Sequence, residues 1–207
     1  MTRSTNIRAA TTIVGVLFSS AVLVAGETEP QKVGKALESH KLTLANAIQT
    51  AQAASKGKAV EARAWLKGNE LMVTVRCSAN EKCMEVPIDV KTGKAGKAVA
   101  AVDAKAHGAT HELVKLMDTN KIELVKAIET AQASTKGIAV MARTRAEKQG
   151  ALAFDVQCVA ADKAYDVIVD GKTGKVTKTR ELVGNAGEHH AAPTHHDGTK
   201  KDAPKKP

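Results

Sequence analysis

The chain has 207 residues and a formal net charge of +9, but only one Trp, one Tyr and two Phe. So few aromatic side chains leave little surface for stacking bases, which argues against a nucleic-acid partner. The basic balance instead suits acidic proteins, lipid head groups or anionic surface polymers. Because lysines are interspersed with acidic residues along most of the chain, a solvated surface is the simplest account of the charge.

The first 26 residues have the three-part plan of a secretory signal peptide. Arg3 and Arg8 precede an uncharged, mostly apolar run over residues 9–25, which ends in small residues before Gly26. The run is short for a bilayer crossing and is interrupted by Thr, Ser and Gly. We expect cleavage near Gly26, no stable membrane span afterwards, and a periplasmic or secreted protein. Retention of the segment as an anchor is the alternative.

An internal duplication is the strongest pattern in the rest of the chain. Residues 32–64 align without a gap with residues 112–144, and 15 of the 33 aligned pairs are identical. After one inserted residue the alignment continues and pairs Cys77 with Cys158. Such similarity indicates two copies of one supersecondary unit. The predicted domains are a signal peptide (1–26), a first repeat (30–103), a second repeat (110–183) and a C-terminal tail (184–207).

Each copy begins with helical periodicity. A short helix is expected over residues 33–38 and 113–118. A longer helix follows, with Thr43 as the N-cap of the first copy. Gly57 and Gly137 stand where a left-handed residue would end each longer helix. The apolar face of the longer helix carries Leu44, Ala47, Ile48 and Ala51 in the first copy and Leu124, Ala127, Ile128 and Ala131 in the second.

After each glycine the pattern changes to strict alternation, which predicts half-buried strands. Their apolar positions run over residues 60–66, 71–77 and 84–90, with equivalents such as 152–158 and 165–169. A fourth strand is expected near residues 97–102 and 175–182. The predicted fold is therefore α+β, with two repeated units. Each unit has a helix, with a short preceding helix, packed on a three- or four-stranded antiparallel sheet.

The hexapeptides "DVKTGK" and "DGKTGK" lie between the third and fourth strands of the two copies. A phosphate cradle needs Gly-x-x-x-x-Gly-Lys-Ser/Thr between a strand and a helix. The only Gly-Lys-Thr lacks the first glycine, and neither hexapeptide precedes a helical pattern. A turn fits better, in which Asp89 or Asp170 accepts backbone hydrogen bonds and Gly93 or Gly174 supplies a positive φ.

With these elements in order, each unit resembles a PepSY domain. The shared features are the "AI..A" helix followed by glycine, the alternating strand at Val73 and Val75, and the closing "VDGKTGK" from Val169, with "IDVKTGK" from Ile88 as a near match. The resemblance covers residues 31–102 and 112–182. The first copy departs from it by carrying Met84 where the second has Tyr165, and by Pro87 within a strand, which suits an edge or a bulge.

The resemblance implies a non-catalytic module of the extracytoplasmic space that binds and restrains peptidases, without catalytic residues to transfer. Tandem units of this shape are also similar to secreted proteins that inhibit hydrolases by laying a concave sheet over them, which is an analogy of fold alone. We therefore expect a protein-binding, non-enzymatic chain without a cofactor, whose partner is a protein such as a peptidase.

Three cysteines in an exported chain raise the question of a disulfide. Cys77 and Cys83 flank the loop "CSANEKC" and form the natural pair. Strand parity opposes the bond, because Cys77 is in phase with the apolar residues of its strand and Cys83 is not. A bulge could reconcile the two, so we predict the bond with this conflict open. Cys158 is then the odd thiol, and a buried apolar role accounts for it.

The histidines suggest a second class of function. His189, His190, His195 and His196 lie in a tail rich in Ala, Pro and Lys, which cannot bury a core. His107 and His111 form a further pair between the repeats. Imidazoles of this kind can capture divalent transition metals such as Zn, Cu or Ni, so metal sequestration by the tail is the alternative function. A soluble tail is the simpler account.

No spacing in the sequence suggests a catalytic constellation. The carboxylates of Glu85 and Asp166 alternate outward or lie in turns, where they usually face water. Trp65, the single tryptophan, is in the outward phase of its strand beside Arg63. Trp65 is either an interface anchor, since tryptophan is enriched in binding hot spots, or a residue covered by the other unit.

Overall fold

The structure, a computed structural model, describes residues 27–101 and 104–182. The predicted signal peptide and the histidine-rich tail lie outside these residues. Among the helices of the described ranges, none is long and apolar enough to cross a membrane. The elements in chain order are α1 (Glu29–Ser39), α2 (Leu44–Ser55), β1 (Lys58–Lys67), β2 (Glu70–Ala79), β3 (Lys82–Ile88), β4 (Val99–Ala100), α3 (Ala104–Asn120), α4 (Leu124–Thr135), β5 (Ile138–Ala146), a 3-10 turn (Lys148–Gly150), β6 (Leu152–Ala160), β7 (Lys163–Asp170) and β8 (Val176–Leu182).

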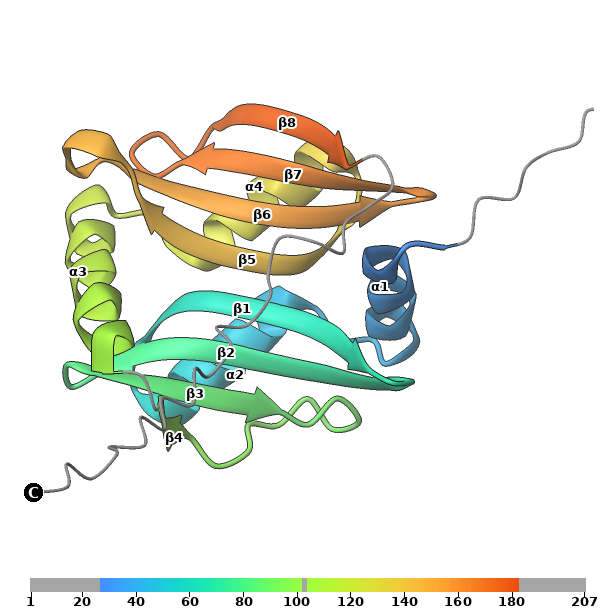
Figure 1. The fold of residues 1–207 in the computed structure, drawn as a ribbon, viewed down its shortest axis with the longest axis horizontal. Helices are drawn as coiled ribbons and strands as arrows, with labels where there is room; N and C mark the ends of the chain where they lie inside the picture. Colours follow the sequence, from blue (N-terminus) through green and yellow to red (C-terminus); the bar gives the residue numbers. More distant parts are fainter. Residues whose placement is uncertain (1–26, 102–103, 183–207) are drawn as a thin grey trace, which may run out of the picture.

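The strands form one antiparallel sheet in the order β4-β3-β2-β1-β5-β6-β7-β8. Each repeat supplies four consecutive strands, and the two halves meet at β1 and β5 (Figure 1). The central pairing is short, with Glu61 opposite Arg143, Ala62 opposite Ala142, and Arg63 opposite Met141. The predicted α+β class is confirmed, because each repeat packs a helix, preceded by another helix, on antiparallel strands.

The longer helices α2 and α4 lie together on one face of the sheet (Figure 1). Their predicted apolar stripes are buried, and alanine at two positions of each stripe lets each helix approach the strands closely. Thr43 caps α2 as expected, since its hydroxyl accepts a hydrogen bond from the Asn46 N–H at 3.2 Å. Phe154, Val75 and Val167 are among the fully buried strand residues beneath this helix layer.

The ends of α2 and α4 differ in detail from the sequence prediction. The left-handed residues are Lys56 and Lys136, each with φ of 54°. Gly57 and Gly137 are required for another reason: a Cβ at these positions would lie 2.4 Å from the Ser78 carbonyl oxygen and 2.5 Å from the equivalent oxygen of the second repeat. Each glycine therefore allows the chain leaving the helix to pass against the neighbouring strand.

A bulge interrupts β1 and β5 at the same point of each repeat. The pairing register shifts between Ala59 and Glu61 in β1 and between Ala139 and Met141 in β5. The extra residue lets two consecutive side chains face the interior, so Ala59 and Val60 are both buried. After the bulge, the remaining residues of β1 alternate between the two faces of the sheet.

The first helix of each repeat packs partly on the other repeat. The Gln31 side-chain amide of α1 donates a hydrogen bond to the Asp162 carbonyl in the β6–β7 turn. At the equivalent position of α3, His111 Nε2 lies 3.9 Å from the Glu81 carboxylate in the β2–β3 turn. Since both helices also contact their own strands, the two repeats share one continuous hydrophobic core.

The two edges of the sheet differ in length because of Pro87. The Pro87 carbonyl accepts a hydrogen bond from Gly96 N–H on the side facing β4. The N–H and C=O of a strand residue point to the same neighbouring strand. Proline has no N–H, so position 87 cannot donate a hydrogen bond to a strand on the β4 side. β4 pairs with β3 only at Met84 and Glu85, whereas β8 pairs along most of β7, where Ile168 replaces the proline.

Candidate interaction site

The sheet has one covered face and one open face. α2 and α4 cover one face, while α1 and α3 stand at opposite sides of the other and leave its centre uncovered (Figure 1). The open face carries the outward side chains of the strands, including Glu61, Arg63 and Trp65 from β1. This uncovered centre is where the repeats meet, so any site on it exists only when both repeats are folded together.

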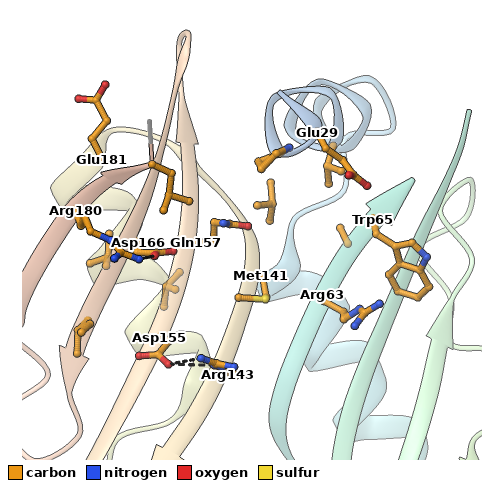
Figure 2. Close-up of a pocket in the computed structure, with 18 of the residues that line it drawn as sticks. Glu29, Arg63, Trp65, Met141, Arg143, Asp155, Gln157, Asp166, Arg180 and Glu181 are labelled. Carbon is orange, nitrogen blue, oxygen red and sulfur yellow. Dashed lines mark hydrogen bonds and ion pairs between the residues drawn. The ribbon is translucent and has the colours of Figure 1, made fainter. Parts of the chain in front are cut away.

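A groove of about 900 Å³ runs along the open face beside α1. We call it the open-face groove. Its walls come from α1, β1 and the four strands of the second repeat (Figure 2). Apolar groups, among them Val33, Met141 and Ile168, alternate with charged ones. The charged and strongly polar residues of the groove are Glu29, Arg63, Arg143, Arg145, Asp155, Gln157, Asp166, Lys178, Arg180 and Glu181.

Arg63 and Trp65 form a stacked pair on the first-repeat side of the groove. They are two residues apart on β1 and therefore point to the same face. The guanidinium carbon of Arg63 lies 4.6 Å from the centroid of the Trp65 ring (Figure 2). Arg63 is exposed and Trp65 half-buried, so the indole keeps part of its surface for a partner while the cation–π contact favours a guanidinium placed over the ring.

Across the groove, the arginines of the second repeat are held by carboxylates. Arg143 contacts one oxygen of Asp155 at 3.1 Å, and Arg145 lies 3.4 Å from the other. Arg180 lies 2.7 Å from Asp166 on the neighbouring strand. These pairs cross adjacent strands and fix charged side chains in one arrangement. The second-repeat wall is thus nearly balanced in charge.

A similar ladder lies on the first repeat, outside the groove. Arg76 bridges Glu61 at 2.7 Å and Glu85 at 3.1 Å, which joins three neighbouring strands. Burial opposes the charged form of this guanidinium, but the two carboxylates outweigh burial and raise the pKa of Arg76. Arg63 is the one arginine within the described residues that has no carboxylate in ion-pair distance.

The two hexapeptides form tight turns of the same geometry. The Asp89 carboxylate accepts hydrogen bonds from the N–H groups of Lys91 at 2.9 Å and Thr92 at 3.0 Å, and Gly93 has φ of 67°. Hydrogen bonds from the Thr92 and Lys91 N–H groups lower the pKa of Asp89. The aspartate itself occupies the amides that a phosphate would need.

The second turn repeats this arrangement. Asp170 Oδ1 accepts from the Thr173 hydroxyl at 2.6 Å and from the Thr173 N–H at 2.7 Å, and these bonds lower its pKa. Gly174 also has φ of 67°, a value that glycine adopts without strain. Asp89, Gly93, Asp170 and Gly174 therefore lie in turns that end β3 and β7.

The predicted disulfide between Cys77 and Cys83 is corrected by the structure, in which the cysteines are not joined. Cys77 lies opposite Met84 and Cys83 lies opposite Ser78 in the β2–β3 register. Since successive strand residues point to opposite faces, Cys77 and Cys83 lie on different faces of the sheet. Cys77 faces the helix layer, where Ser55 contacts its thiol.

Cys158 is buried at the position of the second repeat that matches Cys77. Burial raises the pKa of the Cys158 thiol to about 11, although a hydrogen bond with Thr135 acts in the opposite direction. Burial also raises the pKa of Cys77. Both thiols are therefore protonated and shielded in the folded chain, as a small apolar core residue would be.

The candidate metal ligands are only partly within the described residues. His189, His190, His195 and His196 lie outside them. His107 and His111 are four residues apart on α3, and His111 contacts Glu81. In the part of the chain that the structure describes, no group of three or more His, Cys, Asp and Glu side chains could hold a metal ion.

Sequence reasoning identified Trp65 but missed the groove around it. The outward phase of β1 indicated that Trp65 and Arg63 share a face. Nothing in one repeat alone showed that β1 and β5 would pair, or that α1 would flank the open face of the second repeat. The groove arises from the joining of the repeats.

Comparisons with known proteins add little to this geometry. No family model and no curated protein matches the chain. Among solved structures, the chain is similar to a "putative lipoprotein" from Clostridium difficile 630, with 19% sequence identity and a TM-score of 0.42. The likeness covers 66% of this chain and 90% of that one. A likeness at this TM-score does not identify the function of the chain. The resemblance to PepSY domains stays a prediction.

Proposed function

We propose that this chain is an exported, non-catalytic protein-binding protein that holds its partner in the open-face groove. The observation that carries the proposal is the Arg63–Trp65 pair on the uncovered face of the sheet. Tryptophan and arginine are the residue types most enriched in binding hot spots. Trp65 is the only tryptophan in the chain. The opposite face of the sheet is covered by α2 and α4, which leaves the face with Trp65 as the open one.

The shape and chemistry of the groove favour a polypeptide over a small molecule. Small-molecule sites enclose most of their ligand in a concave, largely apolar pocket. The open-face groove is instead an open surface in which apolar side chains such as Met141 alternate with ion pairs such as Arg143 and Asp155. Apolar anchors surrounded by polar groups are typical of protein interfaces.

The identity of the partner class rests on the sequence rather than on the groove. Export and the resemblance to PepSY domains support a peptidase of the envelope or of the secreted fraction. The positive charge of the chain supports a partner with an acidic surface.

Site-specific photocrosslinking tests the proposal. A photoreactive phenylalanine analogue replaces Trp65 in the groove and, as the matched control, Glu129 on the exposed side of α4. We expect a crosslinked protein from the native compartment at Trp65 and none at Glu129. A peptidase recovered in this way should lose activity when the purified chain is added. Equal crosslinking at both positions, or none at Trp65, contradicts the proposed site.

A further inference from the structure

The charges of the open-face groove specify what its partner must carry. Every other arginine in the described residues has a carboxylate partner: Arg76, Arg143, Arg145 and Arg180 each form at least one ion pair. Arg63 has none, although it is exposed at the wall of the groove. The Arg63 guanidinium is therefore available to form an ion pair with an anionic group of a ligand.

The contact with Trp65 gives this guanidinium a preferred position, over the indole ring. A guanidinium that lies on an aromatic ring still presents its N–H groups at the edge of its plane. Those groups match the two oxygens of a carboxylate, which they can bind through two parallel hydrogen bonds. The stacking also restricts the side chain before binding, so less conformational entropy is lost when the anion arrives.

An apolar patch lies next to this cation. Met141 is directly opposite Arg63 across the β1–β5 pairing, and Pro30 and Val33 of α1 line the same groove. Methionine adapts its shape to different apolar groups. A ligand residue beside the carboxylate would therefore meet an apolar surface.

The carboxylates of the groove offer little to a cationic ligand. Asp155 and Asp166 are each occupied by an arginine, and Glu181 is paired with Lys163. Glu29 is the remaining acid among the lining residues, while Lys178 adds a second cation without an ion pair in the described residues. The unpaired charge of the groove is thus positive, in keeping with the net charge of the whole chain.

We infer that the open-face groove binds an extended acidic segment of its partner protein, with an Asp or Glu carboxylate on Arg63 and a neighbouring apolar side chain on Met141 and α1. This inference rests on the proposed function and names the chemistry that the partner presents. It also predicts that the interaction weakens as salt is added, because the ion pair is formed at an exposed residue.

Trp65 supplies the readout, since its fluorescence is the only tryptophan signal of the chain. The probe is a blocked peptide of alternating Glu and Leu, compared with the corresponding Gln–Leu peptide. We expect the Glu–Leu peptide to change the Trp65 emission and to bind more tightly than the Gln–Leu peptide. Arg63→Gln should weaken binding by about ten- to a hundredfold, the loss expected for a charge-assisted pair.

Lys126→Gln is the matched control, because it removes the same charge from an exposed site on α4. It should leave the affinity unchanged, and Arg63→Lys should restore only part of what Arg63→Gln loses. Equal affinity of the two peptides, full binding by Arg63→Gln, or no binding of the Glu–Leu peptide overturns the inference. A partner crosslinked at Trp65 that meets Arg63 with no carboxylate would refute this inference and leave the proposed function intact.

Discussion

Leu37→Ala tests whether the two repeats are one cooperative unit. Leu37 is fully buried on α1, a helix that contacts strands of both repeats. Truncating a buried leucine to alanine costs about 2–5 kcal/mol, through lost burial and the cavity left behind. For a chain of this size a loss of about 3 kcal/mol lowers the melting temperature by about 6–12 °C. The volume-conserving control, Leu37→Met, should cost less than about 1.5 kcal/mol.

Two buried thiols report on the repeats separately in this experiment. Cys77 belongs to the first repeat and Cys158 to the second, and both are fully buried. If α1 couples the repeats, Leu37→Ala should raise the labelling rate of both thiols by the same factor, about a hundredfold for 3 kcal/mol. Mass spectrometry of the labelled peptides gives each rate. Faster labelling at one thiol alone, or two separate melting transitions, would refute a shared core.

Three further predictions follow from single residues and from the tail. Gly137→Ala should destabilise the fold by about 1–3 kcal/mol in denaturant unfolding, because its Cβ would lie 2.5 Å from the Val159 carbonyl oxygen. Gly34→Ala is its control, since the nearest side-chain atom is 3.4 Å away and alanine favours the helix; equal losses would contradict this reading. Asp170→Asn should lower the melting temperature at neutral pH, and the difference should vanish as the pH falls through the lowered pKa of Asp170, because protonation removes the same stabilisation. A difference that persists in acid would show another cause. Truncation after Val183 should abolish calorimetric zinc binding and preserve partner binding; retained zinc binding would place the metal site outside the tail.

Local sequence pattern predicted most of the fold. Helical spacing at Leu44 and Ile48, alternation after Gly57, and the turn at Asp89 each depend on residues close in the chain, where spacing alone determines the face or the turn. The bulge at Val60 was not predicted. One inserted strand residue does not disturb the alternation of apolar and polar residues on either side of it, so the sequence does not show where the strand changes register.

The arrangement of the repeats could not be predicted in the same way. Pairing of β1 with β5 joins residues about 80 positions apart. The packing of α1 and α3 on the opposite repeat depends on contacts such as that of Gln31 with Asp162. No periodicity within one repeat encodes such contacts. The sequence already showed that Cys83 is out of phase with the apolar residues of its strand. The β2–β3 register places Cys77 and Cys83 on different faces of the sheet, which excludes the disulfide.

The central claim is that the chain binds its partner through the Arg63–Trp65 side of the open-face groove. The most direct test is the dissociation constant of the crosslinked partner for the wild-type chain, for Trp65→Ala, and for Glu129→Ala on the opposite face. A hot-spot tryptophan contributes at least about 2 kcal/mol, so Trp65→Ala should weaken binding by about thirtyfold or more. Glu129→Ala should stay within about twofold of the wild type. Wild-type affinity in Trp65→Ala would contradict the account.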